Sequence, residues 1–233
     1  NRPLRVNDII TFAAEVHGDS EVVSVTVEGG MHRSTYRDIE KRTRQLGHVL
    51  TKLGISQGDR VATLAWNGYR HLELYYGIAG IGAVCHTINP RLSSEQMIYI
   101  VNHAEDKVIF VDLTFVPILA ALKDHLPKDL IYVAMTDRKH MPDTDIVNLL
   151  CYEDLMEAET TDFDWPEFDE NTACGLCYTS GTTGNPKGAL YSHRSTVLHA
   201  MMGVISLQTC LRPGKRILPV VPLFHVNAWG LPY

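Results

Sequence analysis

The sequence has few cysteines, only five in 233 residues, and they are scattered along the chain. A sparse, odd-numbered set does not form the dense disulfide framework of a small secreted scaffold, and it favours a reducing, cytoplasmic compartment. The chain also lacks an excess of basic residues, since its formal net charge is −6. With no basic stripe to meet the phosphates of a polymer, nothing indicates nucleic-acid binding.

Long apolar runs are missing as well. Asp112, for example, interrupts the stretch from Val108 to Leu122, so no transmembrane segment is expected. The chain begins with Asn1 rather than Met and ends at Tyr233 within an apolar stretch, and we expect that both ends are cut and that a targeting peptide would not be visible. What is present, 45% hydrophobic and 21% charged residues, is typical of a globular protein with a sizeable core.

From about residue 60 onward, short apolar runs alternate with segments of helical period. This alternation predicts an α/β fold of stacked βαβ units with a largely parallel sheet. Ahead of it, we expect a strand at Glu21–Val27, a turn at Gly29-Gly30 and a helix capped by Thr35 that ends near Leu53. Further strands are expected at 60–65, 83–88, 108–111, 130–134, 173–178, 189–192 and 216–221, and helices at 70–80, 93–103, 115–125 and 193–207.

The composition changes between Thr136 and Glu170, where Asp, Glu and Pro accumulate around a short amphipathic piece at Tyr152–Ala158. We interpret this stretch as a surface excursion that links two lobes. The expected division is a first α/β lobe at 1–135, the excursion at 136–170 and a second lobe at 171–233.

The segment from Tyr178 to Gly188 places four aliphatic hydroxyls, three glycines and one lysine in a turn between two expected strands. Glycines let backbone N–H groups approach anionic oxygens, hydroxyl groups add donors, and the lysine supplies a positive charge. The segment therefore predicts a phosphate-binding loop. A flexible polar loop is the plainer interpretation of a stretch rich in Gly, Ser and Thr.

Two common phosphate motifs do not fit. Lys187 is followed by Gly188, whereas a Walker A loop continues with Ser or Thr and opens a helix. The glycines between Gly77 and Gly82 are in the wrong order for a dinucleotide fingerprint. They fall within an expected helix, where close helix packing is the more ordinary explanation.

The string from Tyr178 to Gly188, YTSGTTGNPKG, resembles the signature loop of the adenylate-forming superfamily. A second block, PLFHVNAWG at 222–230, resembles the stretch that these enzymes place against the nucleotide and acyl pocket, and 191–195 resembles the junction that follows their loop. Weaker matches at 35–36, 58–62 and 88–90 extend the resemblance over nearly the whole chain, as the N-terminal part of such an enzyme without its C-terminal lid domain. The chain looks most like medium- and long-chain fatty-acid and methylmercaptopropionate CoA ligases.

The resemblance implies an ATP-dependent ligase that makes an acyl-adenylate with Mg²⁺ and then transfers the acyl group to coenzyme A. His225 would be a catalytic donor near the α-phosphate and the carboxylate, where amino-acid-activating relatives usually carry Asp. Thr179 would lie near the Mg²⁺, and Val226, Asn227 and Trp229 would line the substrate pocket. The residues implied to bind ATP are Thr179, Ser180, Gly181, Thr182, Thr183, Gly184, Lys187 and His225, of which Ser180, Gly181, Thr182, Thr183 and Lys187 would hold the β- and γ-phosphates.

Plainer interpretations accompany several of these residues. A histidine among apolar residues is often structural, and a tryptophan is often part of a core. If the block turns as a helix, Trp229 shares a face with His225. We expect His193 to be structural, and we expect Cys174 and Cys177 to pack under the loop, because thiols three apart on a strand diverge.

Two other functions stay open. One is an acyl-AMP ligase that delivers its product to a carrier protein, and the other is a non-catalytic nucleotide-binding fragment. The chain on its own is expected to be inactive, and a homodimer is a further possibility that the resemblance suggests.

Overall fold

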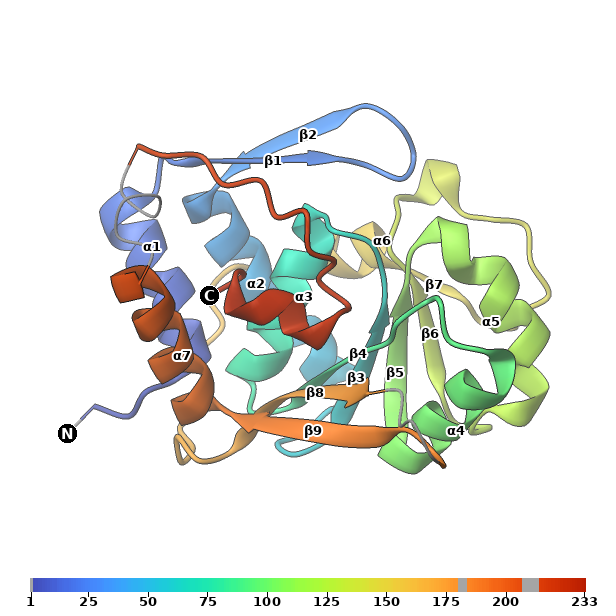
Figure 1. Cartoon of the computed structure of the whole chain (residues 1–233). Helices are drawn as coiled ribbons and strands as arrows, with labels where there is room; N and C mark the ends of the chain where they lie inside the picture. The colour runs from blue at the N-terminus through green and yellow to red at the C-terminus, as the bar shows by residue number, and fades with distance from the viewer. Residues whose placement is uncertain (1, 180–183, 207–213) are drawn as a thin grey trace.

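The computed structural model describes residues 2–179, 184–206 and 214–233 (Figure 1). Its centre is a seven-stranded sheet with the strand order β7-β6-β5-β3-β4-β8-β9. Neighbouring strands are parallel except for the last pair, β8 and β9, which is antiparallel. The strands are β3 Arg60–Leu64, β4 Val84–Thr87, β5 Asp106–Val111, β6 Ile131–Ala134, β7 Leu150–Cys151, β8 Ala173–Thr179 and β9 Lys187–Ser192. The predicted α/β class with a largely parallel sheet is confirmed.

Helices cover both faces of this sheet, as Figure 1 shows. Val61 of β3 packs in one core with Leu74 of α3, and its neighbour Ala62 packs in another core with Ile100 of α4. Successive strand residues point to opposite faces, so a buried strand needs apolar residues at every position. The helices are α1 Val6–His17, α2 Tyr36–Lys52, α3 Tyr69–Gly80, α4 Ser94–Ala104, α5 Val116–Leu122, α6 Tyr152–Glu157 and α7 His193–Ser206, with short 3₁₀ turns at Leu113–Phe115, Lys123–His125, Arg138–His140 and Val226–Gly230.

Two helix starts follow directly from the local sequence. Thr35 caps α2 and exchanges hydrogen bonds with Asp38, and Ser93 caps α4 in the same way with Gln96. Both are capping boxes, in which each side chain satisfies a backbone N–H of the other residue. The predicted cap at Thr35 is confirmed.

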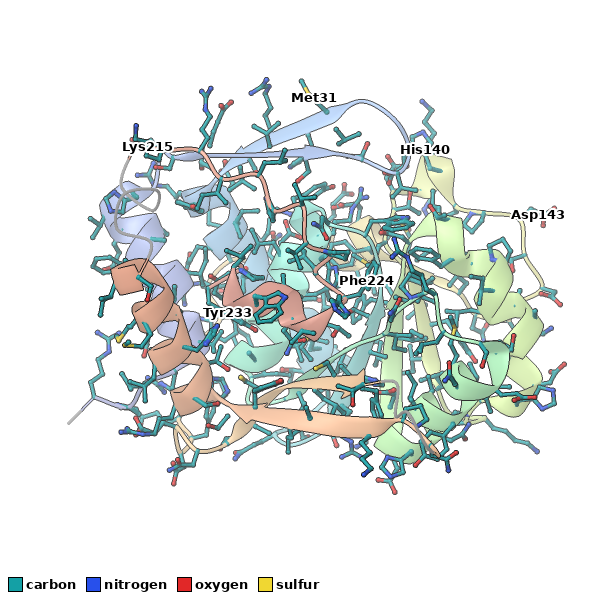
Figure 2. All side chains as sticks on the ribbon, in the orientation of Figure 1. Met31, His140, Asp143, Lys215, Phe224 and Tyr233 are labelled. Atoms are coloured by element: carbon teal, nitrogen blue, oxygen red, sulfur yellow. The ribbon has the colours of Figure 1, made fainter. Side chains whose placement is uncertain are left out.

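A two-stranded hairpin, β1 Glu21–Val25 and β2 Met31–Thr35, lies apart from the main sheet. Its turn contains Gly29 and Gly30, which both have positive φ, and the N–H of Thr26 donates to the carbonyl of Gly30. The predicted turn is confirmed, although the first strand ends two residues earlier than expected. Met31 lies on the exposed surface of this hairpin, as its label in Figure 2 shows.

The segment at 136–170 contributes to the core as well as connecting the flanking strands. It supplies β7 to one edge of the sheet, and it buries Tyr152 and Met156 of α6. Strands from both expected lobes belong to the same seven-stranded sheet. The proposed lobe boundaries stay a prediction, but the surface excursion is only part of what this segment does.

The glycines between Gly77 and Gly82 serve packing, as predicted. A Cβ atom on Gly77 would lie 2.5 Å from Leu46 of α2, and one on Gly80 would lie 2.4 Å from Trp165. The helices and the returning segment therefore approach closely only because these positions have no side chain.

The predicted strand at 216–221 is wrong. Among the residues that the structure describes, this stretch pairs with no strand, and Ile217, Leu218 and Val220 are exposed. Its β-branched residues have strand propensity, but such propensity depends on a neighbouring strand and on packing that this stretch does not have here.

No helix in the described parts of the chain has the length and apolar character needed to cross a bilayer.

Candidate functional site

The hairpin formed by β8 and β9 holds the expected phosphate loop. Thr179, the last residue of β8, pairs with Lys187, the first residue of β9, and the hydroxyl of Thr179 donates to the carbonyl of Lys187 at 3.4 Å. Both side chains are exposed. The structure therefore brings two predicted ATP-binding residues together at the base of the loop.

Within the loop, Gly184 has φ of 98°, a conformation that side chains rarely adopt, and a Cβ atom there would meet no atom of the described residues within 4 Å. Glycine is therefore favoured at position 184 by the positive φ of the backbone. Four of the predicted phosphate-binding residues, Ser180, Gly181, Thr182 and Thr183, lie outside the described residues.

The strand beneath the loop is buried between β4 and β9, and its residues 174–177 are all buried. The Cys174 and Cys177 thiols are free, and burial raises the pKa of Cys174 to about 11. A thiol with a raised pKa is a poor nucleophile and a poor metal ligand at neutral pH. The prediction that these cysteines are small buried residues is confirmed, and Cys174 packs at the start of β8 against α1, α3 and α7.

The second predicted block, residues 222–230, starts with a turn in which the His225 N–H donates to the Pro222 carbonyl at 3.0 Å. Leu223 and Phe224 are buried, whereas His225 is exposed. In Figure 2, Phe224 and Tyr233 mark the course of the chain through this region. The block therefore anchors itself by its apolar residues and leaves the imidazole accessible to a ligand.

The four residues after His225 turn with positive φ, between 47° at Asn227 and 55° at Trp229. Side chains on a right-handed helix share a face at a spacing of four, but this turn is left-handed. His225 and Trp229 therefore do not share the face of a right-handed helix. Trp229 is 65% exposed, so it is not part of the core that the residues of this chain form, and its place in an acyl pocket stays a prediction.

Asn227 ties this turn to the sheet. Its carbonyl oxygen accepts from the Thr87 hydroxyl at the end of β4, at 3.0 Å. On the neighbouring strand, a Cβ atom at Gly175 would lie 2.9 Å from the Asn227 side-chain nitrogen. A side chain at position 175 would therefore require Asn227 to move. The role that these contacts show is anchoring, and a role in the substrate pocket stays a prediction for Asn227 and Val226.

These contacts bring the two predicted regions to the same part of the sheet. Thr87 pairs with Cys177, two residues before Thr179, and β4 and β8 are parallel. In an open parallel sheet, ligands bind at the carboxyl ends of the strands. The loop and the block that contains His225 thus both lie at the edge where an α/β fold places its ligands.

Side chains from three other elements also hold the block, and sequence reasoning missed them. The Tyr75 hydroxyl of α3 donates to the Leu223 carbonyl at 2.5 Å, and the imidazole of His199 on α7 contacts the Trp229 carbonyl at 3.0 Å. Asn67, which follows β3, bonds the backbone at the start of the block and just before it. Its position after a parallel strand is the one signal in the sequence that points to it.

His193 has the structural role that the sequence predicts. It is buried at the start of α7, and its Nδ1 accepts from the N–H of Val6, the first residue of α1, at 3.1 Å. Burial lowers the pKa of His193 to about 4, so the ring is neutral at pH 7 and acts as an acceptor. It joins the two helices and does not reach the loop by any described contact.

The residues present fit a Mg²⁺ ion that arrives with a nucleotide. Mg²⁺ keeps several waters and usually takes one or two protein oxygens together with substrate phosphates. The exposed hydroxyl of Thr179 is one such oxygen. In the parts of the chain that the structure describes, no three His, Cys, Asp or Glu residues converge to hold a metal by themselves.

Comparison with known proteins identifies the family. A model of the AMP-binding enzyme family matches residues 11–233. The chain belongs to this family. Among curated AMP-binding enzymes, the 3-methylmercaptopropionyl-CoA ligase of Ruegeria lacuscaerulensis is 50% identical over 232 residues, 100% of this chain and 43% of that protein. The medium-chain-fatty-acid–CoA ligase of Ectopseudomonas oleovorans is 50% identical over 230 residues, 99% of this chain and 42% of that protein. The chain thus spans less than half the length of these relatives.

Solved structures of two CoA ligases have the same fold. An anthranilate CoA ligase in complex with anthranoyl-AMP superposes with a TM-score of 0.81 at 24% identity, covering 99% of this chain and 44% of the other. A long-chain-fatty-acid-CoA ligase from Archaeoglobus fulgidus superposes with a TM-score of 0.83 at 21% identity, covering 99% of this chain and 45% of the other. At these identities the likeness establishes the fold alone.

Proposed function

We propose that the full-length protein carrying this chain is an AMP-forming acyl-CoA synthetase for a fatty-acid-like carboxylate. In the first step a carboxylate oxygen attacks the α-phosphorus of ATP, the bond to the β-phosphate oxygen breaks, and pyrophosphate leaves. In the second, the coenzyme A sulfur attacks the acyl carbon, and AMP leaves with the carboxylate oxygen. The observation that carries the proposal is the pairing of Thr179 with Lys187 at the base of the loop, at the same sheet edge as His225.

The first step needs positive charge and hydrogen-bond donors around a departing pyrophosphate. Lys187 is exposed at the start of β9, where its ammonium group is available to the β- and γ-phosphates. The Thr179 hydroxyl on the opposite strand is placed to contribute one oxygen to a Mg²⁺ ion bound to the nucleotide. Both residues extend from paired strands, so their backbone positions are fixed before the nucleotide arrives.

His225 is proposed as the donor at the reaction centre. Its imidazole is exposed, while the residues on both sides of it are anchored to the sheet and to α3. An anchored backbone with an accessible ring is what a catalytic donor requires, because preorganisation reduces the cost of orienting the group during the reaction. The choice of a fatty-acid-like substrate is supported by the names of the relatives at 50% identity.

The test is to identify the products. The full-length protein is incubated with ATP, Mg²⁺, coenzyme A and a panel of straight-chain, aromatic and sulfur-containing carboxylates. We expect equal amounts of AMP and acyl-CoA, with a preference within the fatty-acid-like members. Formation of ADP, or absence of any carboxylate-dependent AMP, would contradict the proposal. Acyl transfer to a carrier protein but not to coenzyme A would identify an acyl-AMP ligase that serves a carrier.

A further inference from the structure

The connection between β3 and α3 is held rigidly from two sides. The Trp66 N–H donates to a carboxylate oxygen of Asp112, which follows β5, at 2.6 Å. The Trp66 carbonyl accepts from Nδ1 of His71 at 3.0 Å, and the other ring nitrogen of His71 accepts from the Thr63 hydroxyl at 3.0 Å. Because both backbone groups of Trp66 are fixed by buried side chains, the next residue, Asn67, also has a fixed backbone.

This connection lies where the chain changes direction across the sheet. β3 continues into α3 on one face, and its neighbour β5 continues toward α5 on the other face. The carboxyl ends of two such strands form the crevice in which α/β folds bind ligands. Asn67 therefore lies at the carboxyl ends of β3 and β5, where an α/β fold binds its ligands.

Both the nitrogen and the oxygen of the Asn67 side-chain amide form hydrogen bonds to one backbone segment. Its nitrogen donates to the carbonyls of Pro219 and Val221 at 2.9 and 3.0 Å. Its oxygen accepts from the N–H of Leu223 at 2.7 Å. An asparagine amide has two donor hydrogens and one carbonyl acceptor, so both donors and the oxygen are engaged within five consecutive residues. Residues 219–223 form no strand, and these bonds replace part of a strand's ladder.

The fixed segment leads straight to the exposed imidazole. After Leu223 comes Phe224, which is buried and lies edge-on to Trp66 at 5.9 Å between ring centroids. The next residue is His225. One connection, Trp66 with Asn67, thus contacts both the backbone and the last apolar side chain before His225.

We propose that Asn67 is a positioning residue that sets the direction of His225, an inference that rests on the proposed function. It acts through the backbone of 219–223 and touches no substrate itself. Removal of its amide should leave the Thr179 and Lys187 hairpin intact, because the hairpin is held by pairing between β8 and β9. The defect should therefore appear in the rate of adenylate formation rather than in the binding of ATP.

Two substitutions separate positioning from general folding. Asn67→Ala removes all three bonds. Asn67→Asp keeps the volume and the acceptor for the Leu223 N–H but places an oxygen against the carbonyls of Pro219 and Val221. The matched control is Asn102→Ala on the distant helix α4. The Asn102 side chain also donates to two backbone carbonyls, those of Ile98 and His125.

The first measurement is amide hydrogen exchange of the full-length protein at Leu223, which does not depend on any activity. We expect exchange at this amide to rise about fivefold in Asn67→Ala, since one hydrogen bond contributes on the order of 1 kcal/mol, while exchange in α2 and α3 stays the same. Unchanged exchange at Leu223 in Asn67→Ala would overturn the positioning role.

The second measurement is ATP–pyrophosphate exchange with a saturating carboxylate. For both Asn67 variants we expect kcat to fall at least about tenfold while KM for ATP stays within about threefold, and we expect no change in Asn102→Ala. A rise in KM for ATP without a fall in kcat, or an equal loss in the control, would overturn the inference. If the unaltered protein shows no exchange, the proposed function fails, and the amide measurement still decides whether Asn67 holds the segment. Asn67→Asp also provides the comparison if Asn67→Ala does not fold.

Discussion

Around Glu73, between α2, α3 and α6, charged side chains are buried or half-buried and bonded to one another, whereas Lys187 and His225 are exposed at the carboxyl edge of the sheet. Arg42 bonds Glu73 at 2.6 Å and Glu153 at 2.9 Å, and Arg70 bonds Glu153 and Glu28, each at 2.7 Å. Among the residues that the structure describes, neither Lys187 nor His225 forms an ion pair.

The difference separates stability from function. A buried charge must have its partners within the protein, because leaving water costs several kcal/mol per ion. A group that is to bind phosphate must keep its donors for the ligand. We therefore expect changes around Glu73 to affect folding and changes at the sheet edge to affect the reaction, and the predictions below test this division.

The largest effect is expected for Glu73→Ala. This carboxylate has no exposed side-chain area and also accepts from the Tyr152 hydroxyl at 2.8 Å, so its removal leaves Arg42 and Tyr152 short of a buried partner. Breaking a buried pair costs about 3–5 kcal/mol. Urea unfolding of the full-length protein measures this loss, with Glu157→Ala on the exposed side of α6 as control, for which we expect a change within about 0.5 kcal/mol. If Glu73→Ala lowers the free energy of unfolding by less than about 1 kcal/mol, the charged cluster around Glu73 does not have the stabilising role expected of it.

The next effect is on activity. Lys187→Ala should lower kcat/KM for adenylate formation by about 100-fold or more, the range for a group that stabilises developing charge. Its unfolding free energy should not change, because Lys187 is exposed. The control is Lys128→Ala, another exposed lysine away from the hairpin. Equal activity of the two variants would remove Lys187 from the site.

A pH-dependent effect should come from His71. Burial lowers its pKa to about 4, from an ordinary value of 6.5, so the unfolded chain binds this proton more tightly than the folded protein. The stability that His71 contributes is complete above pH 6.5 and is lost as the pH falls toward 4, by up to about 3 kcal/mol. His71→Gln should therefore lose less stability than the unaltered protein between pH 7 and pH 4.

The quantity to compare is the difference in the free energy of unfolding between the variant and the unaltered protein at each pH. Burial also raises the pKa of Asp112 to about 6, which contributes in the opposite direction between pH 4 and pH 6. His125→Gln, at an exposed position, should follow the unaltered protein at every pH. An identical acid dependence for His71→Gln would show that the pKa of His71 is not lowered in the folded protein.

The smallest effect is expected for Trp229→Ala. The indole is 65% exposed, so its loss should leave stability unchanged. If it borders the acyl pocket, the ratio of kcat/KM between long and short carboxylates should shift by about tenfold, the scale of one hydrophobic contact. Met31→Ala, on the distant hairpin, should leave this ratio unchanged. Identical chain-length profiles for all three proteins would exclude Trp229 from the pocket.

Local signals in the sequence predicted most of the fold. The capping residue Thr35, the turn at Gly29-Gly30 and the strand under the loop were found because each depends on neighbouring residues. The two-residue strand β7 was not found, since its only strand signal is its pairing with β6, which is distant in sequence. The run at 216–221 was wrongly predicted as a strand, because its residues favour strands. No described strand pairs with it.

The site shows the same limit. Thr179, Lys187 and His225 could be predicted because they lie in motifs that are continuous in the sequence. The side chains that hold the block around His225 come from elsewhere in the sequence. Asn67 follows β3 and Thr87 ends β4, and only the folded topology brings them to the block. The left-handed turn at 226–229 could not be predicted either, since Val, Ala and Trp seldom adopt positive φ.

The central claim is that the β8–β9 hairpin and the block at 222–230 together form an adenylate-forming site. The most direct test is isotope exchange between pyrophosphate and ATP, catalysed by the full-length protein with Mg²⁺ and without coenzyme A. The claim predicts exchange that requires a carboxylate and does not require coenzyme A. Exchange that proceeds equally without a carboxylate, or none with any carboxylate of the panel, would contradict it.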